Sequence, residues 1–279
     1  LSIVVGRCES LDEIRELSKL ATRILDNGIE LTVSPIKESA AHNSRYRTVG
    51  IGIQGLHDWL ARHNIGWEDY DAITQVAEFI ELGAVEESIR LAESRGPFPA
   101  FEGSKWQTGE MFSHFKKHSV ESASEWERLR GEAIKHGIRN SQLTSPAPNT
   151  SSAIFMDASP GIMPVYSAFY NEDNRTGKFS VYGMYIKENP LHYERTAPRQ
   201  NQSVLTMVTA SLQKFADAGI SAEYIFDLNA PNFTAKDMFD LIIAAWKNKT
   251  KAIYYIRSIK KGETIDSIIG GESICAGCT

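Results

Sequence analysis

Cysteine is scarce in this chain, whose 279 residues include only three: Cys8, Cys275 and Cys278. Three cysteines, one of them isolated, do not form a disulfide framework, which excludes the class of small secreted domains that depend on disulfides. The count instead suits a reducing compartment. In such a compartment the C-x-x-C pair of the last segment, ESICAGCT, is typical of thiol exchange or of metal binding.

A metal site at Cys275 and Cys278 would need further ligands, because zinc in proteins normally has four. No second C-x-x-C pair occurs in the sequence. The sequence therefore favours dithiol–disulfide exchange at these two cysteines and predicts no metal in this chain. Cys8 has no partner in this pattern, and we assign it no role.

Excess positive charge and long apolar runs are also missing. The formal net charge is −5, which offers no basic field to nucleic acid or to an anionic membrane. The longest apolar run falls far short of the roughly 20 residues that span a bilayer, and the opening LSIVVG is too short for a secretory leader. We therefore predict a cytoplasmic protein (host cytoplasm if the chain is viral) that binds neither nucleic acid nor membrane.

Helices and strands alternate along the first part of the chain. A capping box formed by Ser10 and Glu13 predicts a helix that ends at Asn27–Gly28, and RYRTVGIGIQG predicts a strand that leads into a glycine turn. Residues 96–122 are expected to form a long aromatic-rich loop. The alternation predicts an α/β fold with parallel strands. The opening LSIVV is typical of a buried strand, so we expect the chain to be the downstream part of something longer.

The segment GIGIQG, Gly50 to Gly55, matches the G-x-G-x-x-G pattern of dinucleotide-binding turns. That reading requires a second strand about 20 residues further on, ending in an acidic residue for the ribose. The corresponding segment, WEDYDAITQVAEFIELG, has a helical pattern. A nicotinamide-dependent oxidoreductase is therefore the alternative function, and a glycine-rich strand-to-helix turn is the preferred interpretation.

Two further motifs have both a functional and a structural explanation. Asn149-Thr150-Ser151-Ser152 lies where a strand is expected to turn into a helix. The free backbone amides and polar side chains at such a turn could bind a phosphate or diphosphate. Alternatively, the side chains only cap the helix. Tyr254-Tyr255, in KAIYYIR, is typical of a core strand, and on an ideal strand the two rings would face opposite sides. The residues alone leave both questions open.

Taken in order, several segments resemble the C-terminal part of the large (α) chain of class I ribonucleotide reductase: RYRTVGIGIQGLHDWLA, PFPAFEGSKW, HGIRNSQLTSPAPNTSSAI, LQKFADAGISAEY, KAIYYIR and the terminal CAGC. In that family the catalytic chain is a ten-stranded α/β barrel of two five-stranded halves. The resemblance implies that residues 1–170 form the second barrel half, residues 171–257 a small α/β subdomain, and residues 258–279 a flexible redox tail.

The resemblance also implies roles for the motifs. Asn149, Thr150, Ser151 and Ser152 would hold the substrate diphosphate, Tyr254 and Tyr255 would relay a radical, and Cys275 and Cys278 would re-reduce the active-site disulfide. The family's glycine-isoleucine-glutamate-proline stretch is Gly161-Ile162-Met163-Pro164 here. The family's radical cysteine lies in an Asn-x-Cys-x-Glu pattern, which this sequence does not contain.

The implied function is the reduction of ribonucleotides to deoxyribonucleotides, which supplies DNA replication. The implied partners are an upstream large-chain fragment with the thiyl-radical cysteine, a metal-containing small subunit that generates the radical, a thioredoxin- or glutaredoxin-like protein that supplies electrons, and ribonucleoside diphosphates. A dimer of the large subunit is expected, with no cofactor in this chain. The chain is predicted to be inactive alone; an inactive remnant that only binds partners is a further alternative.

Overall fold

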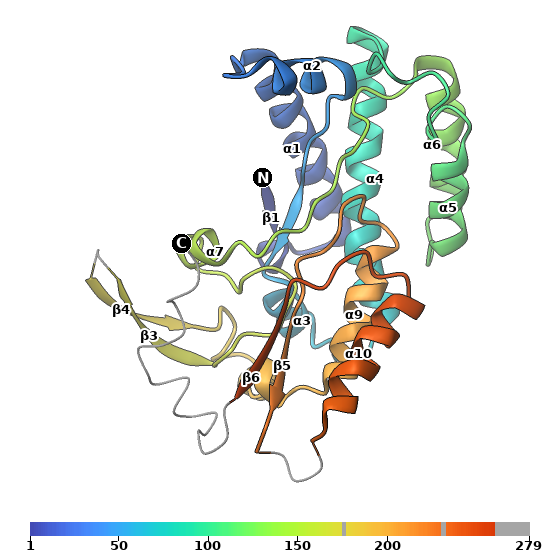
Figure 1. Ribbon diagram of the computed structural model, residues 1–279. Coiled ribbons are helices and arrows are strands. Elements are labelled where there is room, and N and C mark those ends of the chain that lie inside the picture. Colours follow the sequence, from blue (N-terminus) through green and yellow to red (C-terminus); the bar gives the residue numbers. More distant parts are fainter. Residues whose placement is uncertain (175–176, 230–232, 260–279) are drawn as a thin grey trace.

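The computed structural model describes residues 1–174, 177–229 and 233–259 (Figure 1). The helices are α1 (Leu11–Leu31), α2 (Lys37–Tyr46), α3 (Leu56–His63), α4 (Tyr70–Arg95), α5 (Glu110–His118), α6 (Ala123–His136), α7 (Thr150–Phe155), α8 (Pro190–Tyr193), α9 (Gln202–Gln213) and α10 (Ala235–Lys247). The strands are β1 (Ser2–Val4), β2 (Gly52–Gln54), β3 (Phe169–Asn174), β4 (Gly177–Tyr182), β5 (Glu223–Asp227) and β6 (Tyr255–Ile259).

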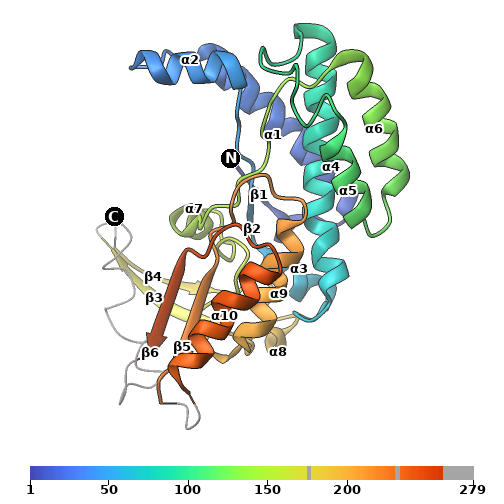
Figure 2. The same cartoon turned by 45° about the vertical axis from the view of Figure 1, so that its right-hand side comes forward.

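The strands pair two by two. Strand β1 runs parallel to β2, β3 runs antiparallel to β4, and β5 runs parallel to β6. A parallel bridge from Ile51 to Thr144 lies beside the first pair. Helix α9 packs against β5, and α10 packs against α9 (Figure 2). The predicted mixture of helices and parallel strands is therefore confirmed for β1–β2 and for β5–β6, whereas β3–β4 is antiparallel.

Helix α4 lies at the centre of the helical part of the molecule, in contact with α1, α6 and α9 (Figure 1). It touches α1 through Gly83, where an added Cβ would lie 2.2 Å from the carbonyl oxygen of Arg15. Only a glycine allows the two helix backbones to come this close. The hydrophobic core around α4 also takes in Leu205, Val208 and Leu212 of α9.

Helix α1 begins as predicted but ends later. The Ser10 hydroxyl accepts a hydrogen bond from the amide of Glu13 (3.2 Å), and the Glu13 carboxylate accepts one from the amide of Glu9 (2.7 Å). The prediction of an end at Asn27–Gly28 was wrong, because the helix continues to Leu31 and the Thr32 amide still donates to the Gly28 carbonyl. A glycine therefore did not end this helix.

Asp26, in the last two turns of α1, is fully buried in a polar network. Its carboxylate accepts hydrogen bonds from Arg47 Nη2 (2.7 Å), Arg95 Nη1 (3.0 Å) and Asn140 Nδ2 (3.1 Å). These partners lie at the C-cap of α2, at the end of α4 and in the segment after α6. The network therefore ties four segments together, and a buried carboxylate requires partners of this kind.

Two other expectations were wrong in part. Residues 96–122 are not entirely a loop, because they contain α5, whose Phe112 and Phe115 are buried against Trp106. The expected strand over RYRTVGIGIQG is regular only at Gly52–Gln54, and its first two residues end α2. In both places tertiary packing decided the structure, and the local pattern did not.

Candidate functional site

Tyr255 is the first residue of β6, Tyr254 immediately precedes it, and the two rings touch. The ring centroids are 4.0 Å apart, with the ring planes inclined by 50°. The backbone amides of both residues point to one acceptor, the carbonyl of Ala222, at 3.1 and 3.3 Å. Tyr254 therefore precedes the regular strand, and the expectation that the two rings face opposite sides was wrong. Tyr254 is also 47% exposed, so the pair is not a core pair.

Charged and phenolic groups surround Tyr255. The guanidinium carbon of Arg257 lies 4.7 Å from the Tyr255 ring centroid, and Arg257 Nε donates to Glu223 Oε2 at 2.9 Å. The hydroxyl of Tyr166 donates to the same carboxylate oxygen. Burial raises the pKa of Tyr166 above its ordinary value, and the Glu223 charge raises it further, so this phenol stays protonated. These contacts had no signal in the sequence.

The segment Asn149–Ser152 forms the expected turn into a helix. Asn149 has left-handed backbone angles (φ 59°), and α7 follows for six residues. The Asn149 side-chain amide donates to the Ile53 carbonyl (3.2 Å), and Gln54 Nε2 donates to the Ser152 hydroxyl (2.9 Å). Both contacts tie the turn to β2. Thr150 and Ser151 are exposed at the first turn of α7 and have no such tie within the described contacts.

The Gly161–Pro164 segment lies next to this turn. Gly161 has φ 54°, and a Cβ added there would lie 3.2 Å from the carbonyl oxygen of Pro148, immediately before Asn149. Two residues after Pro164, Tyr166 reaches Glu223. The segment from Gly161 to Tyr166 therefore connects the helix turn to β5, the strand that pairs with β6.

GIGIQG forms the predicted turn from a strand to a helix. Strand β2 ends at Gln54, Gly55 adopts φ 73°, and α3 follows. A Cβ on Gly55 would lie 3.1 Å from the backbone nitrogen of Gly6, so the glycine also allows close packing of two backbones. Helix α4 occupies the position where the dinucleotide fingerprint requires its second strand. The turn therefore lacks the ribose-binding half of that fingerprint.

Comparison with known proteins shows the family of this chain. The family model described as "Ribonucleotide reductase, barrel domain" matches residues 2–256. The chain belongs to the ribonucleotide reductase family. It is 36% identical to the ribonucleoside-diphosphate reductase subunit alpha of Synechocystis sp., over 96% of this chain and 36% of that protein. It is 30% identical to the subunit of the same name from Treponema pallidum, over 92% of this chain and 30% of that protein.

A further relative is the ribonucleoside-diphosphate reductase large subunit of Caenorhabditis elegans, which is 33% identical over 61% of this chain and 22% of that protein. This reductase chain therefore spans about a third of the length of the alpha subunits from Synechocystis and Treponema. No helix in the described part of the reductase chain combines the length and the apolar character that a membrane crossing requires.

The two cysteines of the reductase chain's last segment, Cys275 and Cys278, lie outside the described residues. Cys8 is buried, and burial, with a smaller contribution from Glu13, raises its thiol pKa to about 11. A thiol with so high a pKa carries little thiolate at neutral pH, so Cys8 is a poor nucleophile. Among the described residues, no group of three or more His, Cys, Asp or Glu side chains is arranged to hold a metal.

One histidine pair was missed in the sequence. His114 and His118 are four residues apart on α5, a spacing that zinc sites use, and their ring centroids are 4.7 Å apart. His114 Nε2 contacts the Lys214 carbonyl oxygen at 3.0 Å. Because no third ligand joins the pair within the described residues, it gives no metal site.

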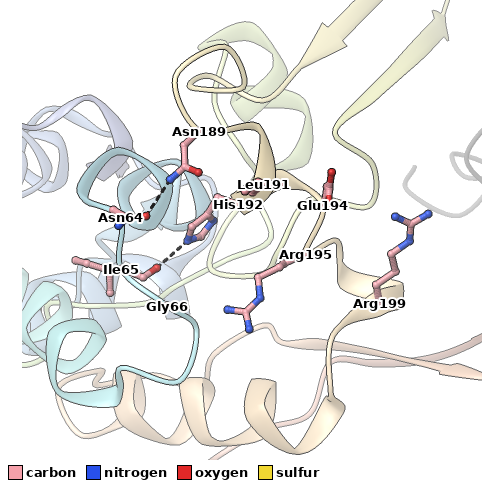
Figure 3. Close-up of a pocket in the computed structure, with 9 residues that line it drawn as sticks. All are labelled: Asn64, Ile65, Gly66, Asn189, Leu191, His192, Glu194, Arg195 and Arg199. Carbon is pink, nitrogen blue, oxygen red and sulfur yellow. Dashed lines mark hydrogen bonds between the residues drawn. The ribbon is translucent and has the colours of Figure 1, made fainter.

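A pocket of about 710 Å³ has no predicted site residue in its lining (Figure 3). It is lined by Asn64, Ile65, Gly66, Asn189, Leu191, His192, Glu194, Arg195 and Arg199. His192 Nε2 contacts the Ile65 carbonyl oxygen at 2.7 Å, and its Nδ1 has no hydrogen-bond partner. These residues come from two separate segments, between α3 and α4 and around α8, so no local pattern predicted the pocket.

Proposed function

We propose that this chain is the downstream part of the catalytic alpha subunit of a class I ribonucleoside-diphosphate reductase, and that Tyr254 and Tyr255 conduct a radical in it. The observation that supports this role is the contact of the two rings at 4.0 Å in a half-exposed position. An aromatic pair that served only the core would be buried. An exposed first ring that touches a second ring suits an entry point from a partner protein.

The chemistry requires phenols. Tyr254 gives up an electron and a proton to an incoming radical and so becomes a neutral tyrosyl radical. Tyr255, in ring contact, then supplies an electron and a proton to Tyr254 and carries the radical onward. The original radical comes from a metal-containing small subunit. The thiyl radical that starts ribonucleotide reduction forms on a cysteine of the upstream part of the large subunit.

The turn at Asn149–Ser152 is proposed to bind the substrate diphosphate. The exposed hydroxyls of Thr150 and Ser151, with the free amides at the start of α7, offer donors to anionic oxygens. Asn149 and Ser152 are tied to Ile53 and Gln54, so they fix the turn against β2. The adjacent Gly161–Pro164 segment, with a methionine at its third position, packs against the residue that precedes the turn.

Cys275 and Cys278 are proposed to return electrons to the active-site disulfide. One thiolate attacks the disulfide and forms a mixed disulfide, and the second cysteine resolves it, so that the pair is itself oxidised. A thioredoxin- or glutaredoxin-like protein then reduces the pair. Cys275 lies 16 positions after Ile259, a stretch that spans at most roughly 55 Å when extended.

Reconstitution tests the proposal as a whole. We expect the isolated chain to form no deoxynucleotide with the small subunit and a dithiol reductant. Addition of the upstream part of the large subunit should restore deoxynucleotide formation from ribonucleoside diphosphates. Activity without the upstream part would contradict the proposal, and inactivity of the complete mixture would favour a remnant that only binds partners.

The diphosphate turn has its own test in the reconstituted enzyme. Thr150→Ala with Ser151→Ala should weaken substrate binding, because each lost charge-assisted hydrogen bond costs about 1.5–3 kcal/mol. Ser44→Ala, at an exposed serine of α2, is the matched control and should leave the substrate dissociation constant unchanged. Unchanged substrate affinity in the double variant would assign the turn to helix capping alone.

The cysteine pair is tested by the choice of reductant. With both cysteines changed to serine, turnover driven by thioredoxin should be lost, whereas a small dithiol that diffuses into the active site should still support it. Equal loss with both reductants would contradict the shuttle. One zinc ion per chain retained after dialysis of the unmodified protein would assign the pair to a metal instead.

A further inference from the structure

Three side chains from distant segments meet beside Tyr255: Tyr166, Glu223 and Arg257. Glu223 Oε2 accepts hydrogen bonds from both the Tyr166 hydroxyl and Arg257 Nε. The guanidinium of Arg257 lies over the face of the Tyr255 ring at 4.7 Å. Two hydrogen bonds therefore fix the Glu223 carboxylate, and the Arg257 guanidinium lies against the Tyr255 ring.

The strand geometry explains why these groups meet. In the parallel pair of β5 and β6, Glu223 lies opposite Tyr255, and Ile225 lies opposite Arg257. Tyr255 and Arg257 are two residues apart on β6, so their side chains lie on the same face of the strand. Tyr166 approaches from the segment after Gly161–Pro164. Three chain segments therefore contribute one group each to the surroundings of one phenol ring.

Stability is a weak reason for this arrangement. The side chains of Arg257 and Glu223 are 39% and 17% exposed, and ion pairs at such partly exposed sites contribute little, about 0–1 kcal/mol. The protein has a comparable pair in Arg195 and Glu68, at 3.1 Å, for which no aromatic ring contact is found among the described residues. What distinguishes the Arg257–Glu223 pair is the ring that it holds.

We propose that Glu223 and Arg257 are positioning residues for Tyr255, with Tyr166 fixing Glu223; this rests on the radical-transfer role proposed above. The planar guanidinium fixes the orientation of the ring and so keeps it in contact with Tyr254. The carboxylate has a second effect. A bare cation over an aromatic face stabilises the electron-rich ring and so opposes loss of an electron, and Glu223 offsets that charge.

The two effects predict an unequal pattern among variants. Glu223→Gln leaves the guanidinium without its counter-charge over the ring, so the variant should lower kcat the most, by about tenfold. Arg257→Gln removes the cation as well as the contact and should lower kcat by about threefold. The double variant should behave like Arg257→Gln, and Glu223→Gln should therefore cost nothing further once Arg257 is gone. Arg257→Lys keeps the charge but loses the planar contact and should not restore full kcat.

The test uses the complete enzyme, with both parts of the large subunit, the small subunit, a ribonucleoside diphosphate and a small dithiol as reductant. The measurements are kcat and KM, and KM should stay within about twofold of the unmodified enzyme in every variant. Tyr166→Phe should lower kcat in the same direction as Glu223→Gln but by less. Arg195→Gln and Glu68→Gln are the matched ion-pair controls and should leave both constants unchanged.

The outcomes separate this inference from the function on which it rests. If Tyr255→Phe is inactive while Glu223→Gln and Arg257→Gln have normal kcat, the positioning role is wrong and the radical role stands. If Tyr255→Phe is fully active, both are wrong. Losses that multiply in the double variant, or a KM that rises with the fall in kcat, would show a general structural role and overturn the inference.

Discussion

Helix α4 and strand β6 differ in how they meet their surroundings. Helix α4 is buried on nearly every side, including the carboxylates of Glu78, Glu81 and Glu87. In β6 only Ile259 is buried, and the tyrosine pair at its start is partly exposed. Residues of α4 therefore have many packing partners to lose, whereas residues of β6 have few. Substitutions in α4 should reduce stability, and substitutions at the start of β6 should reduce activity with little change in stability.

The largest expected effect is at Trp126, which packs beside α4. Trp126 is fully buried, and its indole N–H donates to Glu78 Oε1 at 3.0 Å. Trp126→Ala leaves a cavity and removes a hydrogen bond from a buried carboxylate, so the free energy of unfolding should fall by about 3–5 kcal/mol. Denaturant unfolding measures the change. Trp246→Ala on α10, where the side chain is 73% exposed, is the control and should stay within about 0.5 kcal/mol.

The contact between α1 and α4 is tested at Gly83. An alanine there would bring its Cβ to 2.2 Å from the Arg15 carbonyl oxygen, so the helices must separate, and overpacking of this kind costs about 1–3 kcal/mol. Gly131→Ala on α6 is the control, because nothing lies within 4 Å of its added Cβ. That control should raise the free energy of unfolding by about 0.4–1 kcal/mol. Equal effects at the two glycines would contradict the close contact.

A smaller effect should depend on pH. Burial raises the pKa of Glu81 well above its ordinary value, and the charge of Asp217 raises it further, so Glu81 is protonated in the folded protein. The unfolded chain releases this proton at the ordinary pKa. The contribution of Glu81 to stability is therefore present below that pKa and is lost as the pH rises through the folded-state pKa.

Glu81→Gln, which mimics the protonated form, should abolish this loss. Between pH 5 and 8 the free energy of unfolding of the unmodified protein should decrease relative to that of Glu81→Gln, as measured by denaturant unfolding across the range. Glu16→Gln, at a side chain that is 68% exposed and paired with Lys19, is the control and should differ from the unmodified protein by a constant amount. A difference between Glu81→Gln and the unmodified protein that does not change with pH would mean that Glu81 is ionised in the folded state.

The smallest expected effect on stability is at Tyr254. Phenylalanine keeps the ring and its contact with Tyr255, and it removes only a hydroxyl from a half-exposed side chain. The free energy of unfolding should change by less than about 0.5 kcal/mol. A loss comparable to that of Trp126→Ala would mean that the pair belongs to the core, as its sequence alone suggested, and would remove the contrast between α4 and β6.

Much of the fold was predictable because its signals are local. The cap of Ser10 and Glu13 marked the start of α1, and GIGIQG marked the turn from β2 into α3. Predictions failed where distant segments decided the outcome. Helix α1 continues past Gly28, and there Glu30 pairs with Arg47 and Arg139 of distant segments. Burial of Phe112 and Phe115 forms α5 within a segment that was expected to be a loop.

In the candidate site, too, the features set by local sequence were predictable and those set by distant segments were not. The turn at Asn149–Ser152 and the strand at Tyr255 were predictable from their neighbours in the sequence. The ring contact of the tyrosines was not, because it depends on where regular pairing with β5 begins. The meeting of Tyr166, Glu223 and Arg257 was not predictable either, since 57 residues separate the first two and 34 the last two.

The central claim is that the tyrosine pair serves radical transfer and not packing, and kcat of Tyr254→Phe in the reconstituted enzyme tests it most directly. Tyr182→Phe is the control, because Tyr182 is 56% exposed and its ring also lies beside another aromatic ring, that of Phe169. We predict that Tyr254→Phe lowers kcat by at least about a hundredfold, with KM and the free energy of unfolding unchanged, whereas Tyr182→Phe keeps full activity. Equal, normal turnover in the two variants would contradict the claim.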